Sequence, residues 1–177
     1  MTDVTEPDEA PAAPAAPPEP ELVHGAPVTW SHGQRVLHPS RDQLVTFVTA
    51  LHDDGYLVCL DVTATDYLTH PGRDLPAGII AERFELVVTL MSHRDRERVR
   101  LRVQVPGDDP TVASLFAVHP GTEAMEREVF DMFGIQFDGH PDLTRILMPE
   151  DWVGHPLRKD YDSGRIPVQF KGAPASG

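Results

Sequence analysis

Residues 126–161 read EREVFDMFGIQFDGHPDLTRILMPEDWVGHPLRKDY, and charge, glycine and proline are denser together here than elsewhere in the chain. From Met125 to Phe133 the apolar residues recur with the spacing of one helix face. This pattern predicts a short amphipathic helix that Thr122 caps and Gly134 ends. On its outer face, pairs such as Glu123 with Arg127 and Arg127 with Asp131 stand four residues apart, where each stabilises a lone helix by only about 0.2–0.5 kcal/mol.

The chain after this helix is expected to be extended. Ile135 and Phe137 continue in strand-like alternation, and Asp138 with Gly139 predicts a reversal. His140 and His155 each precede a proline, which disfavours helical dihedrals at the histidine. We therefore expect short extended pieces, or a segment ordered by something outside itself. It closes in Pro156–Tyr161, a basic, acidic and aromatic run of the kind enriched at protein interfaces.

These motifs resemble a known family, that of the C subunit of the proton-pumping NADH:quinone oxidoreductase, respiratory complex I. The residues that carry the resemblance are Glu126-Arg127-Glu128, Asp131, Phe133-Gly134-Ile135, Gly139 to Leu143, Arg145-Ile146-Leu147, Asp151-Trp152 and Gly154 to Tyr161. The resemblance is strong over roughly the last third of the chain. Ala124 stands where an aromatic residue is expected and Thr144 where a basic residue or proline is usual, so packing and one contact are expected to differ there.

The resemblance implies an α/β (α+β) fold, with a mixed or antiparallel sheet and a few helices. We expect residues 1–21 to be a disordered acidic tail, because alanine, proline and carboxylates offer little apolar surface to bury. Residues 22–134 are then the globular domain, and residues 135–177 an extended arm that binds a partner. Within this arm, the sparse apolar content of Ile166–Phe170 suggests that it lies along a neighbour.

The resemblance also implies a function. The chain would be a cofactor-free subunit of the peripheral arm that helps assemble the quinone-site module and hold it in shape. Its partners would be the quinone-site subunit, which resembles a hydrogenase large subunit, and iron-sulfur subunits. FMN and iron-sulfur clusters would lie in those partners. The chain would sit on the cytoplasmic side of the cell membrane as a peripheral protein held through its partners.

Interlocking charge pairs at a contact between subunits would explain the charged cluster of this stretch, because arginine can fork onto a carboxylate and fix register. The residues alone slightly favour a solvated face, and the resemblance reverses that preference. The candidate interface residues are Glu126, Arg127, Glu128, Asp131, His140, Arg145, Trp152, His155, Arg158, Lys159, Asp160 and Tyr161.

Composition excludes several classes of function. The chain has 177 residues and a formal net charge of −13, which disfavours direct binding to nucleic acid or to anionic lipid. It has no apolar run of about 18 residues, as a membrane span requires, and its first residues lack a signal peptide's pattern, so we expect it in the cytoplasm. One cysteine, Cys59, cannot hold an iron-sulfur cluster by itself and is expected to be a small buried hydrophobe.

The first half of the chain predicts a helix and a strand. Ser40 and Gln43 form a capping-box pattern ahead of apolar residues at helical spacing, and Gly55 ends this helix. The apolar run Tyr56–Val62 predicts a buried strand, and 70–78 a loop.

Two alternating segments then predict a β-hairpin. They are 84–90 and 99–105, joined by the polar turn 92–97. Arg98, Arg100 and Arg102 form a row on one face, for which a solvated face that pairs with Glu85 is favoured over a binding stripe. Thr111 is expected to cap a short helix that continues to Val118.

The sequence lacks the common enzyme motifs. It contains no dinucleotide glycine fingerprint, Walker A loop, serine elbow or H-E-x-x-H helix. A different class of function, a free-standing metal-dependent enzyme, would draw on His140, Asp142, Asp151, His155 and Asp160, but their spacing fits no helix face. The nearer alternative is the equivalent subunit of a membrane-bound nickel-iron hydrogenase or of another dehydrogenase related to complex I.

Overall fold

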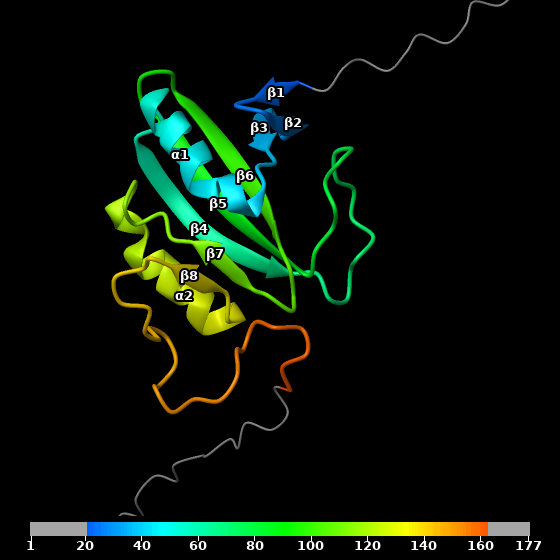
Figure 1. Cartoon of the computed structure of the whole chain (residues 1–177), viewed down its shortest axis with the longest axis vertical. Coiled ribbons are helices and arrows are strands. Elements are labelled where there is room, and N and C mark those ends of the chain that lie inside the picture. The colour runs from blue at the N-terminus through cyan, green and yellow to red at the C-terminus, as the bar shows by residue number, and fades with distance from the viewer. Residues whose placement is uncertain (1–20, 163–177) are drawn as a thin grey trace, which may run out of the picture.

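The computed structural model describes residues 21–162. All but the last residue of the predicted disordered tail, 1–21, and the extended piece at Ile166–Phe170 lie outside the described residues. Within them, a six-stranded sheet carries two α-helices on one face (Figure 1). This arrangement is the α+β fold with a mixed sheet that the sequence predicts.

The sheet has the strand order β1-β2-β3-β6-β5-β4. Its strands are β1 (Leu22–Val23), β2 (Ala26–Ser31), β3 (Gln34–Leu37), β4 (Val58–Asp66), β5 (Phe84–Ser92) and β6 (Glu97–Val105). All neighbours are antiparallel except β3 and β6, which are parallel. The predicted hairpin is confirmed as β5 and β6. The strand predicted from Tyr56 is present as β4, but it starts later than predicted and is only partly buried, because it lies at the edge of the sheet.

The three strands β1 to β3 were not predicted from the sequence. They are short, and their turns are the histidine-glycine pairs 24–25 and 32–33. His24, Gly25, His32 and Gly33 all have positive φ, between 46° and 82°. A two-residue turn with positive φ at both positions matches the twist of a hairpin. Each His-Gly pair is therefore the signal for a hairpin.

The helices lie over the apolar face of the sheet (Figure 1). A 3₁₀ turn, η1 (Arg41–Gln43), leads into α1 (Leu44–Asp53), and η2 (Pro120–Thr122) leads into α2 (Glu123–Phe133). Both helices were predicted, but neither Ser40 nor Thr122 donates or accepts a side-chain capping bond. Gly134 ends α2 with φ 71°, in the left-handed conformation that a glycine adopts without strain.

The predicted helix from Thr111 to Val118 is wrong. Residues Thr111–Ala113 form strand β7, which pairs in parallel with β8 (Gln136–Asp138). Val112 lies opposite Phe137, and both side chains are buried. β-branched residues favour a strand, and here a partner strand is present to satisfy their backbone groups. The extended path predicted through Ile135 and Phe137 is confirmed.

One hydrophobic core joins these elements. It is formed by the inward residues of the sheet, one face of each helix, and the β7–β8 pair. No helix within residues 21–162 is long and apolar enough to span a bilayer.

Replacement of Leu101 by alanine tests the core. Leu101 lies on β6, between β3 and β5, and has an exposed fraction of 0%. The variant should lower the free energy of unfolding by about 2–5 kcal/mol, because it removes buried methyl groups and leaves a cavity. Arg98→Ala, an exposed position on the same strand, should change it by less than about 0.5 kcal/mol. Equal losses in urea denaturation would contradict this core.

Candidate functional site

The carboxylate of Asp131 is the centre of the candidate site. It lies in the last turns of α2 with 0% exposure. Its Oδ2 accepts backbone N–H bonds from Ile146 (3.1 Å), Leu147 (2.8 Å) and Met148 (2.8 Å), and its Oδ1 accepts Nη1 of Arg145 at 2.6 Å. Burial raises the pKa of Asp131, but these hydrogen bonds outweigh burial and hold the pKa below its usual range. The carboxylate of Asp131 is therefore ionised in the folded protein at neutral pH.

The predicted arm starts at residue 135, but Gln136–Asp138 form strand β8. From here on we call residues 139–162 the arm; the structure shows no helix or strand in this part of the chain. The arm also satisfies carbonyls at the end of α2, which lack partners within the helix. His155 Nδ1 donates to the carbonyl of Asp131 (3.0 Å), and the Leu157 N–H donates to that of Met132 (3.0 Å). Arg158 Nε donates to the carbonyl of Phe133. The arm therefore caps the helix.

Gly134 allows this close approach. A Cβ at this position would lie 2.5 Å from Nε2 of His155 and 2.6 Å from Nη2 of Arg158. The positive φ of Gly134 already disfavours other residues. The glycine in the motif is thus required by the backbone turn and by the arm packed against it.

Asp66 is a second anchor of the arm. This buried residue at the end of β4 accepts the backbone N–H of Lys159 at 2.9 Å and Nη2 of Arg83 at 2.9 Å. Arg83 Nη2 also donates to Oδ1 of Asp160 at 2.7 Å. Burial raises the pKa of Asp66, but bonds from Arg83, Lys159 and Leu68 outweigh burial and lower it. Asp66 and Arg83 were not predicted as site residues, because only the fold brings them to the arm.

Hydrogen bonds from Arg127 and His140 also fix the start of the arm to α2. Arg127 donates from Nε to the carbonyl of Thr144 (3.0 Å) and from Nη2 to its hydroxyl (2.9 Å). His140 Nε2 donates to the carbonyl of Glu123 at 3.0 Å. Glu123 and Arg127 lie 3.7 Å apart, as predicted. The predicted pair of Arg127 with Asp131 is wrong, because Asp131 turns inward to Arg145.

Glu126 is a third buried carboxylate, with 0% exposure. It accepts hydrogen bonds from the hydroxyl of Ser114 (2.6 Å), the N–H of Leu115 (2.7 Å) and the hydroxyl of Thr122 (3.0 Å). These bonds join the turn after β7 to the start of α2. The side chains of Glu126 and Asp131, both proposed as interface residues, thus face this chain's own interior.

The remaining candidates lie closer to the surface. Glu128 is exposed and has no ion pair within residues 21–162. The backbone of Lys159 is bonded to Asp66 while its residue is exposed. Trp152 is half-buried, and its indole N–H has no acceptor in the described chain. The half-buried ring of Tyr161 lies against Gly154, where a Cβ would come within 2.8 Å of it.

The arm also exposes large apolar side chains, which sequence analysis did not single out. They are Ile146 (42%), Leu147 (58%), Val153 (87%) and Leu157 (51%). We call these four side chains the apolar arm surface. Asp131 binds the backbone of Ile146 and Leu147, while the side chains of both residues lie at the surface.

The described residues contain no ligand set of the kind that the alternative of a metal-dependent enzyme requires. Residues 21–162 contain no group of three or more His, Cys, Asp or Glu side chains placed to hold a metal. His140 and His155 each use a ring nitrogen for a backbone carbonyl, and Asp160 is paired with Arg83. Burial raises the pKa of the Cys59 thiol to about 11, which keeps it protonated at neutral pH.

Comparison with known proteins agrees with this architecture. Residues 37–166 match the family described as respiratory-chain NADH dehydrogenase, 30 Kd subunit. The chain belongs to this family. Similar proteins, each named as the C subunit of NADH-quinone oxidoreductase, come from Mycolicibacterium gilvum, 49% identical over 140 residues, and from Saccharopolyspora erythraea, 45% identical over 149 residues. These matches cover 77% and 82% of this chain.

Two solved structures resemble this chain. The trypsin-resistant fragment of Nqo5 is 32% identical with a TM-score of 0.59, and the match covers 68% of this chain and 91% of the fragment. A chain of an archaeal membrane-bound sulfane sulfur reductase shares the fold, with a TM-score of 0.61 at 20% identity over 86% of this chain and 90% of that one. The chain spans 58% and 56% of the two curated relatives' lengths.

Replacement of Asp131 by asparagine tests the central anchor. At pH 7 the variant should lower the free energy of unfolding by about 3–5 kcal/mol, because it leaves Arg145 and backbone N–H groups without a buried charge. The folded pKa of Asp131 is lowered, so its stabilisation is present above the unfolded value of about 3.9 and is lost as pH falls through the folded value. The difference from wild type should therefore shrink as the pH falls below about 4, read by urea denaturation.

Glu128→Gln is the matched control, since it removes one negative charge from the exposed side of the same helix. It should change the free energy of unfolding by less than about 0.5 kcal/mol. A difference between Asp131→Asn and wild type that stays constant with pH would contradict the role of the ionised carboxylate.

Proposed function

We propose that the chain acts as the C subunit of a proton-translocating NADH-quinone oxidoreductase, respiratory complex I. The observation that carries this proposal is the apolar arm surface on a segment without helix or strand, fixed to the domain by buried carboxylates. In a free monomer these apolar side chains stay exposed to water, which is unfavourable, whereas an obligate subunit buries them against its partner. Family membership and the names of the relatives support the same assignment.

The role proposed is structural. Asp131 and Asp66 hold the arm in one conformation before a partner binds, so little conformational entropy is lost at assembly. Aliphatic side chains at the centre then exclude water, and the charged groups at the edge fix register. The partner proposed is the quinone-site subunit that resembles a hydrogenase large subunit, with iron-sulfur subunits beside it. An obligate contact of this kind buries about 2,000 Å² or more.

Electron transfer is assigned to the partners. With one cysteine, the chain lacks the thiolates that an iron-sulfur cluster uses. FMN and the clusters would be held by other subunits, and this chain would keep the quinone pocket in shape. It would lie peripherally on the cytoplasmic side of the cell membrane, held by protein contacts, since its net charge of −13 disfavours anionic lipid.

A pull-down from gently solubilised membranes tests this assignment. The tagged full chain should retain quinone-site and iron-sulfur subunits together with NADH:quinone activity. Retention of a nickel-bearing large subunit without that activity would instead place the chain in a hydrogenase-type complex. Recovery of the chain alone would contradict both assignments.

The double variant Leu147→Ser, Val153→Ser tests the apolar arm surface. Both side chains are more than half exposed, so the melting temperature of the isolated chain should hardly change. Burial of each is worth about 1.5–3 kcal/mol at an interface, so the retained partner subunits should fall at least about tenfold. Leu22→Ser, an equally exposed leucine on β1 far from the arm (Figure 1), should leave retention unchanged. Equal retention by the arm variant and this control would rule out the surface as the contact.

A further inference from the structure

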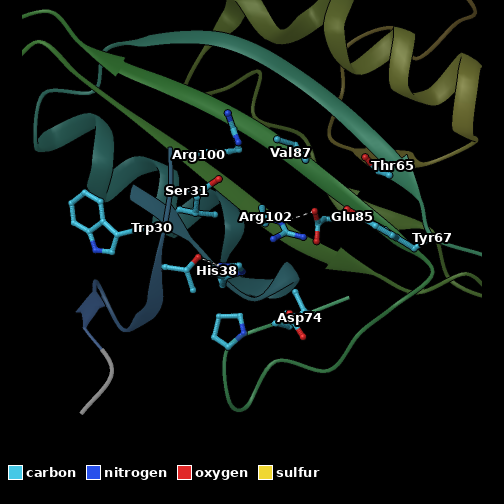
Figure 2. A pocket seen from close by; sticks show the side chains of 14 residues that line it. Trp30, Ser31, His38, Thr65, Tyr67, Asp74, Glu85, Val87, Arg100 and Arg102 are labelled. Carbon is cyan, nitrogen blue, oxygen red and sulfur yellow. Dashed lines mark hydrogen bonds and ion pairs between the residues drawn. The ribbon is translucent and has the colours of Figure 1, made fainter. Parts of the chain in front are cut away.

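The sheet face opposite the helices carries a second surface that the arm does not explain. A pocket of about 590 Å³ lies on this face, between residues of β2 to β6 and the loop residues 74–76 (Figure 2). Its floor includes Val36 and Val87, and Trp30, with 62% of its surface exposed, stands at the rim. A hollow with an exposed tryptophan beside arginines has the composition of an interaction site.

The charges in and around the pocket are unbalanced. Glu85 is buried and accepts Nε of Arg102 at 2.7 Å, and its other oxygen lies 3.6 Å from Nε of Arg73. This carboxylate is therefore shared by two guanidinium groups. Asp74 lies at the rim and is exposed. The predicted pairing of the arginine row with Glu85 is thus confirmed for Arg102 only.

Arg100 has no carboxylate of its own. Its side chain lines the pocket beside Arg102 and Val87 (Figure 2). It makes no hydrogen bond or ion pair within residues 21–162. Arg98, two residues before it on the same face of β6, is exposed and also lacks an acidic partner in this part of the chain. In a chain of net charge −13, this is a local excess of positive charge.

The surface is suited to a peptide more than to nucleic acid. One exposed aromatic side chain does not make the repeated stacking platform that single strands use. The total charge of the chain also repels a polyanion. A short acidic segment escapes much of that repulsion, because its few carboxylates meet the local excess of arginine, and its neighbouring side chains can cover Trp30 and the apolar floor.

We propose that this sheet face is a second docking surface, which binds an extended segment of a partner subunit that carries a carboxylate next to an apolar side chain. The carboxylate pairs with Arg100, and the apolar side chain packs on Trp30, Val36 and Val87. The surface lies across the sheet from α2, so it is separate from the apolar arm surface. The inference rests on the proposed function in one respect, that the segment comes from a subunit of the same assembly.

A photo-crosslink in the assembled complex tests this. A benzoyl-phenylalanine at position 30 replaces one exposed aromatic residue by another, in the tagged full chain purified from membranes. The expected product joins position 30 to an acidic, apolar segment of another subunit. Arg100→Glu should lower its yield at least about tenfold, because a charge-assisted hydrogen bond worth about 1.5–3 kcal/mol is replaced by repulsion. Arg94→Glu makes the same charge change in the β5–β6 turn, outside the lining of this pocket and of the neighbouring one that also includes Trp30, and should leave the yield unchanged.

Three results would overturn the proposal: no crosslink from position 30, a crosslink only to this chain's own acidic residues 1–20, or equal yields from the two arginine variants. A complex that still assembles in any of these cases leaves the proposed function intact.

If wild type instead comes out without partners, the proposed function fails, and the docking surface is tested on the isolated full chain. The probe is the blocked peptide Leu-Glu-Phe-Asp, compared with its Leu-Gln-Phe-Asn counterpart. Saturable quenching of tryptophan fluorescence by the acidic peptide alone, lost in Arg100→Glu, would support the surface. The same response to both peptides, or to neither, would reject it.

Discussion

The structure depends on one buried carboxylate and three consecutive backbone N–H groups. Asp131 stands at the end of α2, and its Oδ2 accepts the amides of Ile146, Leu147 and Met148. A segment without regular secondary structure has no partners for its own amides, and an unpaired buried amide is costly. One side chain of α2 thus provides the hydrogen-bond acceptor for amides of the arm that, in a strand, would bond to a neighbouring strand.

The other anchors repeat this solution. Asp66 binds the amide of Lys159 across 93 positions of sequence, and Glu126 binds that of Leu115. Each carboxylate is buried, and each is compensated by several donors and not by one ion pair alone. Such sites tolerate little change, since removal of the charge leaves donors without acceptors. They hold the domain, the β7–β8 connection and the arm together.

This internal use of charge changes how the motif is understood. Several residues that resemble an interface signature act within the chain, and through them the backbone of the arm is held so that aliphatic side chains face outward. Recognition would then depend on the apolar arm surface, while the carboxylates determine its shape. The two roles are separate, so a loss of assembly can arise from either the surface or its anchors.

Sequence patterns predicted the elements whose side chains alternate or recur, such as β5, β6, α1 and α2, because burial on one face leaves a period in the sequence. Sequence patterns failed where only a few residues determine the local structure. The His-Gly turns were not interpreted, and Thr111–Ala113 joined a parallel strand. The anchors were missed for a related reason: a carboxylate on a helix gives no sign of whether it faces water or amides. Asp66 and Arg83 meet the arm only through the fold.

Amide hydrogen exchange in the isolated full chain tests the account most directly. If buried carboxylates hold the arm, the amides of Ile146, Leu147, Met148 and Lys159 should exchange far more slowly than that of Val153, which makes no backbone hydrogen bond in the described chain. Their protection should approach that of α2, because opening the arm breaks bonds at the end of this helix. Exchange of all five amides at the rate of an unstructured peptide would contradict the account.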